Sequence, residues 1–518
     1  MSVQDDSPGR KEKRVLYGKV AKHGAVWWVA GESFAQLVAI PTVVVLARLL
    51  TPHEFGVVAA ANFFSMLGNR IAALGLNAAL VRLKEVREEH KSSVLVANLS
   101  VGLAIYALLW FAAPTIGRFY GSGEIADVLR VVGVVFVVQP LGSVSMALLS
   151  RDLRIRAGAA ASLSADVSFA LVAIPLAWAG FGYWSLAYAH VAAAVLATAV
   201  RVGLARWWPR SWFSMAAFRE VFSFGMGLFT KRLIDYSAQN LDSLIVGRVL
   251  GITSLGFYDK AFNTMDRLLR RFTVAPGVSF RIFALIQDDL PRFRAAYLKV
   301  VLSATLLAFP VFAVLALSAR EFVLVAFGGQ WLPAVVPLQI LCGAAALKVL
   351  NVYASLAIQA SGKVWSEVWR QSTYAVLIVV GITALSGWGV AGAALAVLGA
   401  TIVGTALLQQ LASRLAGVTR RDLATALAPG LSCTVIVAVA VFAAQTLLPG
   451  ALQAQPAPWQ LLLCDAATAA VCYLAFLRFS RRAAVRDLVH EVAVDLAPWL
   501  TRFLPTRPAE PKVEAASR

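Results

Sequence analysis

The sequence has few charged residues and few cysteines for its length. Charged residues occupy 14% of the 518 positions and hydrophobic residues 59%, and the mean hydropathy is +0.73. The four cysteines lie inside apolar runs and show no ligand spacing with the five histidines, so neither a disulfide framework nor a metal site is indicated. No pair of nucleophile and base, glycine-rich phosphate loop or zinc pattern stands out in the sequence. We therefore expect neither an enzyme nor a bound cofactor.

Long apolar runs take the place of soluble domains. They recur from Ala25 to Phe479, which predicts a protein of the lipid bilayer. The net charge of +19 does not indicate nucleic-acid binding, because the basic residues lie between the apolar runs and form no basic domain.

At about 20 apolar residues per crossing, the sequence predicts about fourteen membrane-spanning helices. The expected spans are 25–49, 55–81, 92–117, 126–150, 159–179, 183–206, 219–249, 255–282, 296–319, 333–360, 366–386, 389–414, 424–448 and 459–480.

The turns between these spans alternate in charge. One set contains clusters such as Arg151, Arg154 and Arg156, whereas the turn Ser386 to Gly389 contains no charge. The positive-inside rule places the basic turns and both termini in the cytoplasm. Residues 1–22 are basic and lack the apolar core of a removable signal peptide. Residues 481–504 have the spacing of an amphipathic interfacial helix, and 505–518 have a disordered composition.

One segment of the chain occurs twice. Val45 to Phe64 recurs without a gap at Ile245 to Thr264, an offset of 200 that pairs Gly56 with Gly256 and continues to Arg70 and Arg270. Duplicated halves are typical of transporters that bind their cargo between two similar lobes.

Charged side chains inside spans normally face a wet cavity or a partner. The first, second, seventh and eighth spans are the most polar, so we expect them to line a cavity. The cationic candidates are Arg48, Arg70, Lys231, Arg232, Arg248, Arg267, Arg270 and Lys348. The polar or ion-coupling candidates are Glu32, Asn69, Asp166, Asp235, Asp242, Asp259 and Asp266.

Plainer interpretations compete with these assignments. Arg48 and Arg248 lie near the outer ends of their spans, where snorkelling to lipid headgroups is the favoured alternative. Asp166 and Asp465 are isolated acids in apolar helices, and a hydrogen-bonded acid in a helix contact is favoured over a titrating, ion-coupled one.

Five segments in order resemble the polysaccharide transporter family of lipid-linked oligosaccharide flippases. They are ARLLTPHEFGVVAAANFF, GLNAALVRL, FYGSGEIADVLRV, NLDSLIVGRVLGITSLGFYDKAF and FALIQDDLPRFRAAYL. The likeness covers about residues 15 to 420 and is greatest to Wzx-type and colanic-acid-exporter-like members. These belong to the MOP superfamily, which also holds MurJ and the MATE multidrug exporters.

The resemblance implies an all-α polytopic membrane protein with two pseudo-symmetric six-helix lobes, 23–210 and 211–416, followed by two further helices in 417–480. It implies alternating access around a cationic cavity that binds undecaprenyl-diphosphate-linked oligosaccharide. The function would be its export across the bacterial inner membrane for O-antigen, capsule or exopolysaccharide synthesis, alongside polymerase and export proteins. The acidic residues among the basic ones depart from a purely cationic pocket.

Two other functions stay open at the level of sequence. A MATE-like exporter of small molecules would share the fold, but its cationic cargo favours an acidic cavity, against the basic eighth span. A membrane polymerase or ligase of the same pathway would carry a large outer loop with catalytic residues, and the outer loops here are short.

Overall fold

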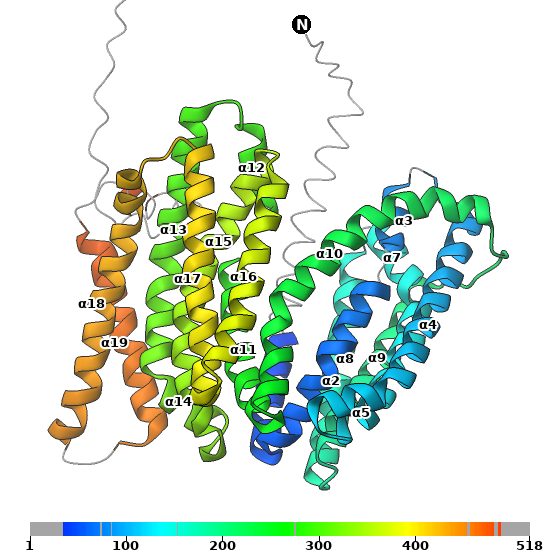
Figure 1. The fold of residues 1–518 in the computed structure, drawn as a ribbon, viewed down its shortest axis with the longest axis horizontal. Coiled ribbons are helices and arrows are strands. Elements are labelled where there is room, and N and C mark those ends of the chain that lie inside the picture. The colour runs from blue at the N-terminus through cyan, green and yellow to red at the C-terminus, as the bar shows by residue number, and fades with distance from the viewer. Residues whose placement is uncertain are drawn as a thin grey trace, which may run out of the picture. The chain divides into compact units, whose positions relative to one another are not determined.

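The computed structural model describes residues 35–72, 75–83, 85–152, 154–273, 276–452, 456–480, 485–487 and 490. This part of the chain is helical and contains no strand. The helices are Ala35–Leu49, α2 (Pro52–Ala72), α3 (Leu76–Arg82), α4 (Glu88–Tyr120), α5 (Glu124–Val132), α6 (Val135–Leu141), α7 (Ser143–Arg151), α8 (Ile155–Trp178), α9 (Tyr183–Ala205), α10 (Met215–Val249), α11 (Ile252–Phe272), α12 (Pro276–Leu285), α13 (Leu290–Leu317), α14 (Ala319–Ala326), the 3-10 helix η1 (Gly329–Ala334), α15 (Val335–Ala360), α16 (Val364–Ala384), η2 (Ser386–Trp388), α17 (Gly389–Leu415), α18 (Arg420–Leu452) and α19 (Pro458–Phe479) (Figure 1).

The all-α polytopic class is confirmed. Eight of the described helices are long and apolar enough to cross a membrane. The polar helices α2, α10 and α11 are not among these eight; α10 contains the predicted seventh span, and α2 and α11 cover the first parts of the second and eighth. Every predicted span falls on helical structure in its described part, but a total of fourteen crossings stays a prediction.

Three predicted spans are interrupted. The range 55–81 divides into α2 and α3, 126–150 into α5, α6 and α7, and 255–282 into α11 and α12. Glycines mark two of these breaks, Gly75 before α3 and Gly133 after α5. Hydropathy averages over such breaks, so it predicts one span where the backbone makes several helices.

The chain forms two compact units. The first contains the described residues up to Asp259 together with Ala326–Gln330, and the second contains Lys260–Val325 and the described residues from Trp331 onward. The lobes 23–210 and 211–416 and the pair of helices in 417–480 stay predictions. Most of the expected interfacial helix 481–504, and all of 1–22 and 505–518, lie outside the described residues.

The sequence repeat is also a structural repeat. Helices α2 and α11 begin at 52 and 252 and end at 72 and 272, so the offset of 200 holds at both ends. Their first turns cross within the first unit. A methyl group on Gly56 would fall on the backbone carbonyl of Ile252, and one on Gly256 on the carbonyl of Pro52. The repeated glycine is therefore required on both helices for their backbones to approach, as at other membrane helix crossings.

We expect Gly256→Ala to lower the free energy of unfolding by about 1–3 kcal/mol, the usual cost of overpacking. Thermal unfolding of the purified protein in detergent measures the loss. The control is Gly203→Ala in α9, where an added methyl meets no atom within 4 Å. Equal melting temperatures for the two variants would show that the crossing tolerates a side chain.

A buried acid joins α13, α18 and α19 in the second unit. The carboxylate of Asp465 is 1% exposed, and its Oδ2 accepts hydrogen bonds from Ser318 Oγ and Gln445 Nε2, each at 2.7 Å. Its Oδ1 has no hydrogen-bond partner within the described part of the chain. The contact agrees with the interpretation of Asp465 as a hydrogen-bonded acid between helices.

We expect Asp465→Ala to destabilise the second unit by about 1–3 kcal/mol, because Ser318 and Gln445 would lose their buried acceptor. Asp465→Asn keeps one acceptor oxygen and should lose less. Melting temperatures of both variants test this, and an alanine variant as stable as the asparagine variant would contradict it.

Candidate functional site

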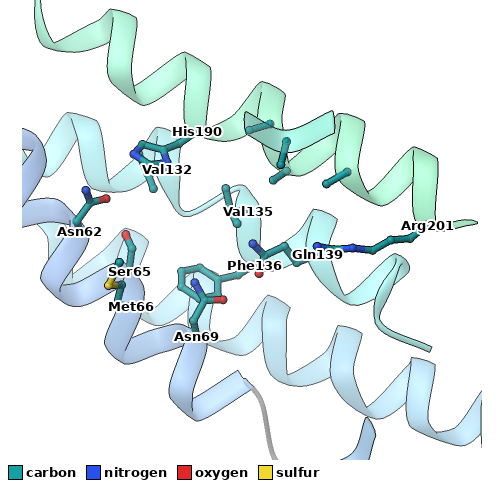
Figure 2. Close-up of a pocket in the computed structure, with 14 residues that line it drawn as sticks. Asn62, Ser65, Met66, Asn69, Val132, Val135, Phe136, Gln139, His190 and Arg201 are labelled. Atoms are coloured by element: carbon teal, nitrogen blue, oxygen red, sulfur yellow. The ribbon is translucent and has the colours of Figure 1, made fainter. Parts of the chain in front are cut away.

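A cavity of about 220 Å³ lies within the first unit. Figure 2 shows its walls, which come from α2, α5, α6, α8 and α9. The lining residues are Asn62, Ser65, Met66, Asn69, Val132, Val135, Phe136, Gln139, Ala165, His190, Ala193, Ala194, Ala197 and Arg201.

Helix α2 supplies most of the uncharged polar groups. Asn62, Ser65, Met66 and Asn69 follow one another at intervals of three, one and three residues, which places them on one face of the helix. The Ser65 hydroxyl donates to the carbonyl of Ala61 at 3.0 Å. The amides of Asn62 and Asn69 make no hydrogen bond to other described residues, so they are available to a ligand.

The interrupted span 126–150 supplies another wall of the cavity. Helix α6 contains Pro140, which has no N–H to donate, and the helices on either side of Gly142 meet at a bend of 43°. Irregular backbone at membrane depth is tolerated where it is buried in protein or lines a cavity. Phe136 and Gln139 face the cavity from α6, immediately before this bend (Figure 2).

Helix α9 contributes a narrow stripe with a polar group at each end. His190 and Arg201 flank three alanines, Ala193, Ala194 and Ala197, at helical spacing. The His190 ring packs against Phe169 of α8 with the ring centroids 5.0 Å apart. Because alanine side chains are short, they leave the space that the cavity occupies.

Arg201 is the charged group of this site. It is the one permanently charged side chain among the described lining residues, and no described lining residue is acidic. Its Nε is buried without a hydrogen-bond partner in the described part of the chain. In Figure 2 its side chain extends from α9 toward Gln139. Burying an unpaired charged donor is costly, so the arrangement calls for an acceptor.

Of the predicted site residues in the first unit, Asn69 lines the cavity. Asp166 is half-buried next to the lining residue Ala165. Arg48 and Arg248 are exposed, and the Arg248 guanidinium lies over the Phe119 ring at 5.5 Å.

The two predicted acids near the end of the first unit differ in burial. Asp242 is 1% exposed and accepts a hydrogen bond of 2.6 Å from the Tyr258 hydroxyl. Asp259 is half-buried. Neither is among the residues that line the cavity.

The predicted residues of the second unit lie mainly on α11. Arg267 is exposed, and the guanidinium of Arg270, 76% exposed, forms an ion pair of 2.7 Å with Asp266. Lys348 of α15 is half-buried with its Nζ over the Phe262 ring at 5.2 Å. Glu32 and the side chains of Arg70, Lys231, Arg232 and Asp235 lie outside the described residues.

Sequence reasoning missed Gln139, His190 and Arg201. A signal existed: within α9 Arg201 is the one residue with a permanent charge, and it shares a face with His190 and three alanines. Its position close to the basic turn that begins at Arg206 is typical of a topology signal, which conceals its role in the sequence. The described residues contain no group of three or more potential metal ligands.

Two known proteins of similar sequence carry names that refer to succinoglycan and lipopolysaccharide biosynthesis. The succinoglycan biosynthesis transport protein ExoT of Rhizobium meliloti is 29% identical over 60% of this chain and 64% of its own length. The lipopolysaccharide biosynthesis protein WzxC of Escherichia coli is 24% identical over 62% of this chain and 65% of its own. The matched region therefore spans just under two thirds of these two relatives.

Two solved structures share the fold. Lipid II flippase MurJ in an inward closed conformation matches 90% of this chain and all of its own, with a TM-score of 0.72 and 14% identity. An inward-facing MATE multidrug transporter of the MOP superfamily matches 74% of this chain and 95% of its own, with a TM-score of 0.57 and 16% identity.

The expected likeness to MurJ and MATE is thus confirmed at the level of fold. The family described as "Polysaccharide biosynthesis protein" matches residues 45–336, more than half of the chain. The chain belongs to this polysaccharide biosynthesis protein family.

Proposed function

We propose that this protein is a flippase that moves undecaprenyl-diphosphate-linked oligosaccharide across the bacterial inner membrane for surface polysaccharide synthesis. Family membership and the names of its relatives ExoT and WzxC support this cargo. The fold is shared with a protein named as a lipid II flippase. The protein is a multi-pass membrane protein, and cytoplasmic termini are part of the proposal.

The observation that carries the proposal is a cavity inside a bundle of membrane helices whose lining includes uncharged polar side chains and an arginine. A diphosphate with attached sugars cannot cross hydrocarbon alone, because it would lose the water around its charges and hydroxyls. The amides of Asn62, Asn69 and Gln139 and the guanidinium of Arg201 offer fixed donors in place of that water. Arginine suits phosphate oxygens because its planar fork can donate two parallel hydrogen bonds.

The cycle we propose is alternating access. Helices α2 and α11 are duplicated within the chain. In transporters with such internal repeats, rocking of the similar halves exposes the binding site to each side of the membrane in turn. Residues predicted from sequence, including Arg70, Lys231, Arg232 and Arg267, remain candidates for that central site. Asp266 offsets part of the positive charge of Arg270. No covalent bond forms or breaks in this cycle, so the protein would act as a carrier.

We expect depletion of the protein to trap lipid-linked repeat units on the inner leaflet. Their glycans should then be open to a soluble glycosidase in inside-out vesicles and protected in right-side-out spheroplasts. Loss of a polymerase would place the units on the outer leaflet, and loss of a small-molecule exporter would leave their amount unchanged. Either pattern would argue against a flippase.

We expect Arg270→Ala to reduce polysaccharide export by roughly two- to five-fold, the effect of removing an exposed charge contact of up to about 1 kcal/mol. Surface polysaccharide is measured at equal protein abundance in the membrane. Arg292→Ala is the matched control, because Arg292 is 78% exposed and pairs with Asp289 at 3.1 Å outside the predicted spans. Equal export by the two variants would remove Arg270 from the binding site.

A further inference from the structure

We propose that the first unit by itself contains an oxyanion site, in which Arg201 binds a phosphoryl or carboxylate group and the neighbouring amides bind sugar hydroxyls. The inference rests on the proposed function for the identity of the cargo. It assigns the ligand chemistry of the cavity and names the residue that the charge contact depends on.

The charge of the cavity supports an anionic ligand. Arginine keeps its positive charge in proteins. Arg201 has a buried Nε without a partner, and none of the described lining residues is acidic. His190, the remaining titratable side chain in the lining, is either neutral or positive. A cation would therefore meet only repulsion or neutral groups here.

Other arginines of the same unit show what a structural role looks like. Arg151 donates to the backbone carbonyls of Leu80 and Leu83 at the end of α3. Arg154 donates to the carbonyl of Leu204 at 3.0 Å. These contacts satisfy carbonyls that a helix end leaves unpaired. Arg201 makes no such contact within the described chain, so helix capping does not account for it.

The shape and the uncharged groups fit a small, hydroxylated ligand. The cavity of about 220 Å³ is smaller than the 300–1,000 Å³ of typical drug-sized pockets, roughly the scale of one sugar ring or one diphosphate. The amides of Asn69 and Gln139 can both donate and accept, which matches sugar hydroxyls. Phe136 and the alanines of α9 provide the apolar surface beside them.

The Arg201 stem lies beside the bend between α6 and α7. Its Cδ lies 3.5 Å from the point where a methyl group on Gly142 would stand. The atoms nearest to that point are Cγ2 and Cα of Thr198, at 3.2 and 3.3 Å, so Gly142 lets α9 pack closely against the break between α6 and α7. The site thus combines a helix break with one unpaired cation.

Thiol labelling of the full-length protein in proteoliposomes tests the sign of the cavity. Met66→Cys is the reporter, because Met66 lines the cavity, is 54% exposed and carries none of the proposed polar contacts. The four native cysteines lie in the second unit, and the parent chain gives their background reaction. Rates are compared for the anionic sulfonatoethyl and the cationic trimethylammonioethyl methanethiosulfonates.

For Met66→Cys, we expect the ratio of the anionic to the cationic labelling rate to exceed the ratio for a free thiol. Arg201→Gln should lower this ratio on the order of five-fold, because Coulomb's law gives an effect of that size for a unit charge several ångströms away. Arg118→Gln, which removes an exposed arginine at the end of α4, should leave the ratio unchanged. A ratio that Arg201→Gln does not alter overturns the proposal. Ala193→Cys on α9 repeats the measurement from the opposite wall.

Protection of the same cysteine identifies the oxyanion. Protection by inorganic pyrophosphate, lost in Arg201→Gln, assigns the site to the carrier diphosphate, and protection by methyl glucuronide assigns it to an acidic sugar. Equal protection by neutral methyl glucoside, or protection by none of the three, overturns the oxyanion site. These readouts do not involve transport. A positive result with normal leaflet distribution after depletion would therefore reject the flippase function and retain the site.

Discussion

The structure depends on one constraint, which is that hydrocarbon offers no water to polar groups on a spanning helix. Each such group needs a partner within the protein or a cavity that admits solvent or cargo. The Oδ2 of Asp465 meets the constraint through Ser318 and Gln445, and that of Asp242 through the hydroxyl of Tyr258. Arg201 meets it in the other way, by facing a cavity.

The same constraint explains the form of the first unit. A helix broken at Gly142 can exist at membrane depth because its neighbours bury it or because it lines a cavity. Alanines on α9 and the polar face of α2 keep that cavity open and wettable. Close backbone contact at Gly56 and Gly256 joins the first turns of α2 and α11. Small residues thus set both the tight contact and the open space.

Much of the architecture follows from local sequence. Hydropathy located helical structure in the described part of every predicted span, because apolar length is a property of consecutive residues. The repeated segment found in the sequence extends into α2 and α11, whose bounds keep the same offset of 200. The candidacy of Asn69 followed from the polarity of the second span. The breaks inside 126–150 were not predicted, because an average over twenty residues conceals one glycine or proline.

The sequence by itself determined the all-helical membrane class, the repeat and the family resemblance, since each depends on neighbouring residues or on segments read in order. Only the tertiary structure added Arg201 to the arginines that are candidates to bind cargo. Arg151 and Arg201 are the same residue type near the ends of apolar helices, yet Arg151 reaches carbonyls of α3 and Arg201 reaches a cavity. Whether these two arginines are paired depends on atoms of other helices brought close by packing, and spacing along the chain does not contain that information.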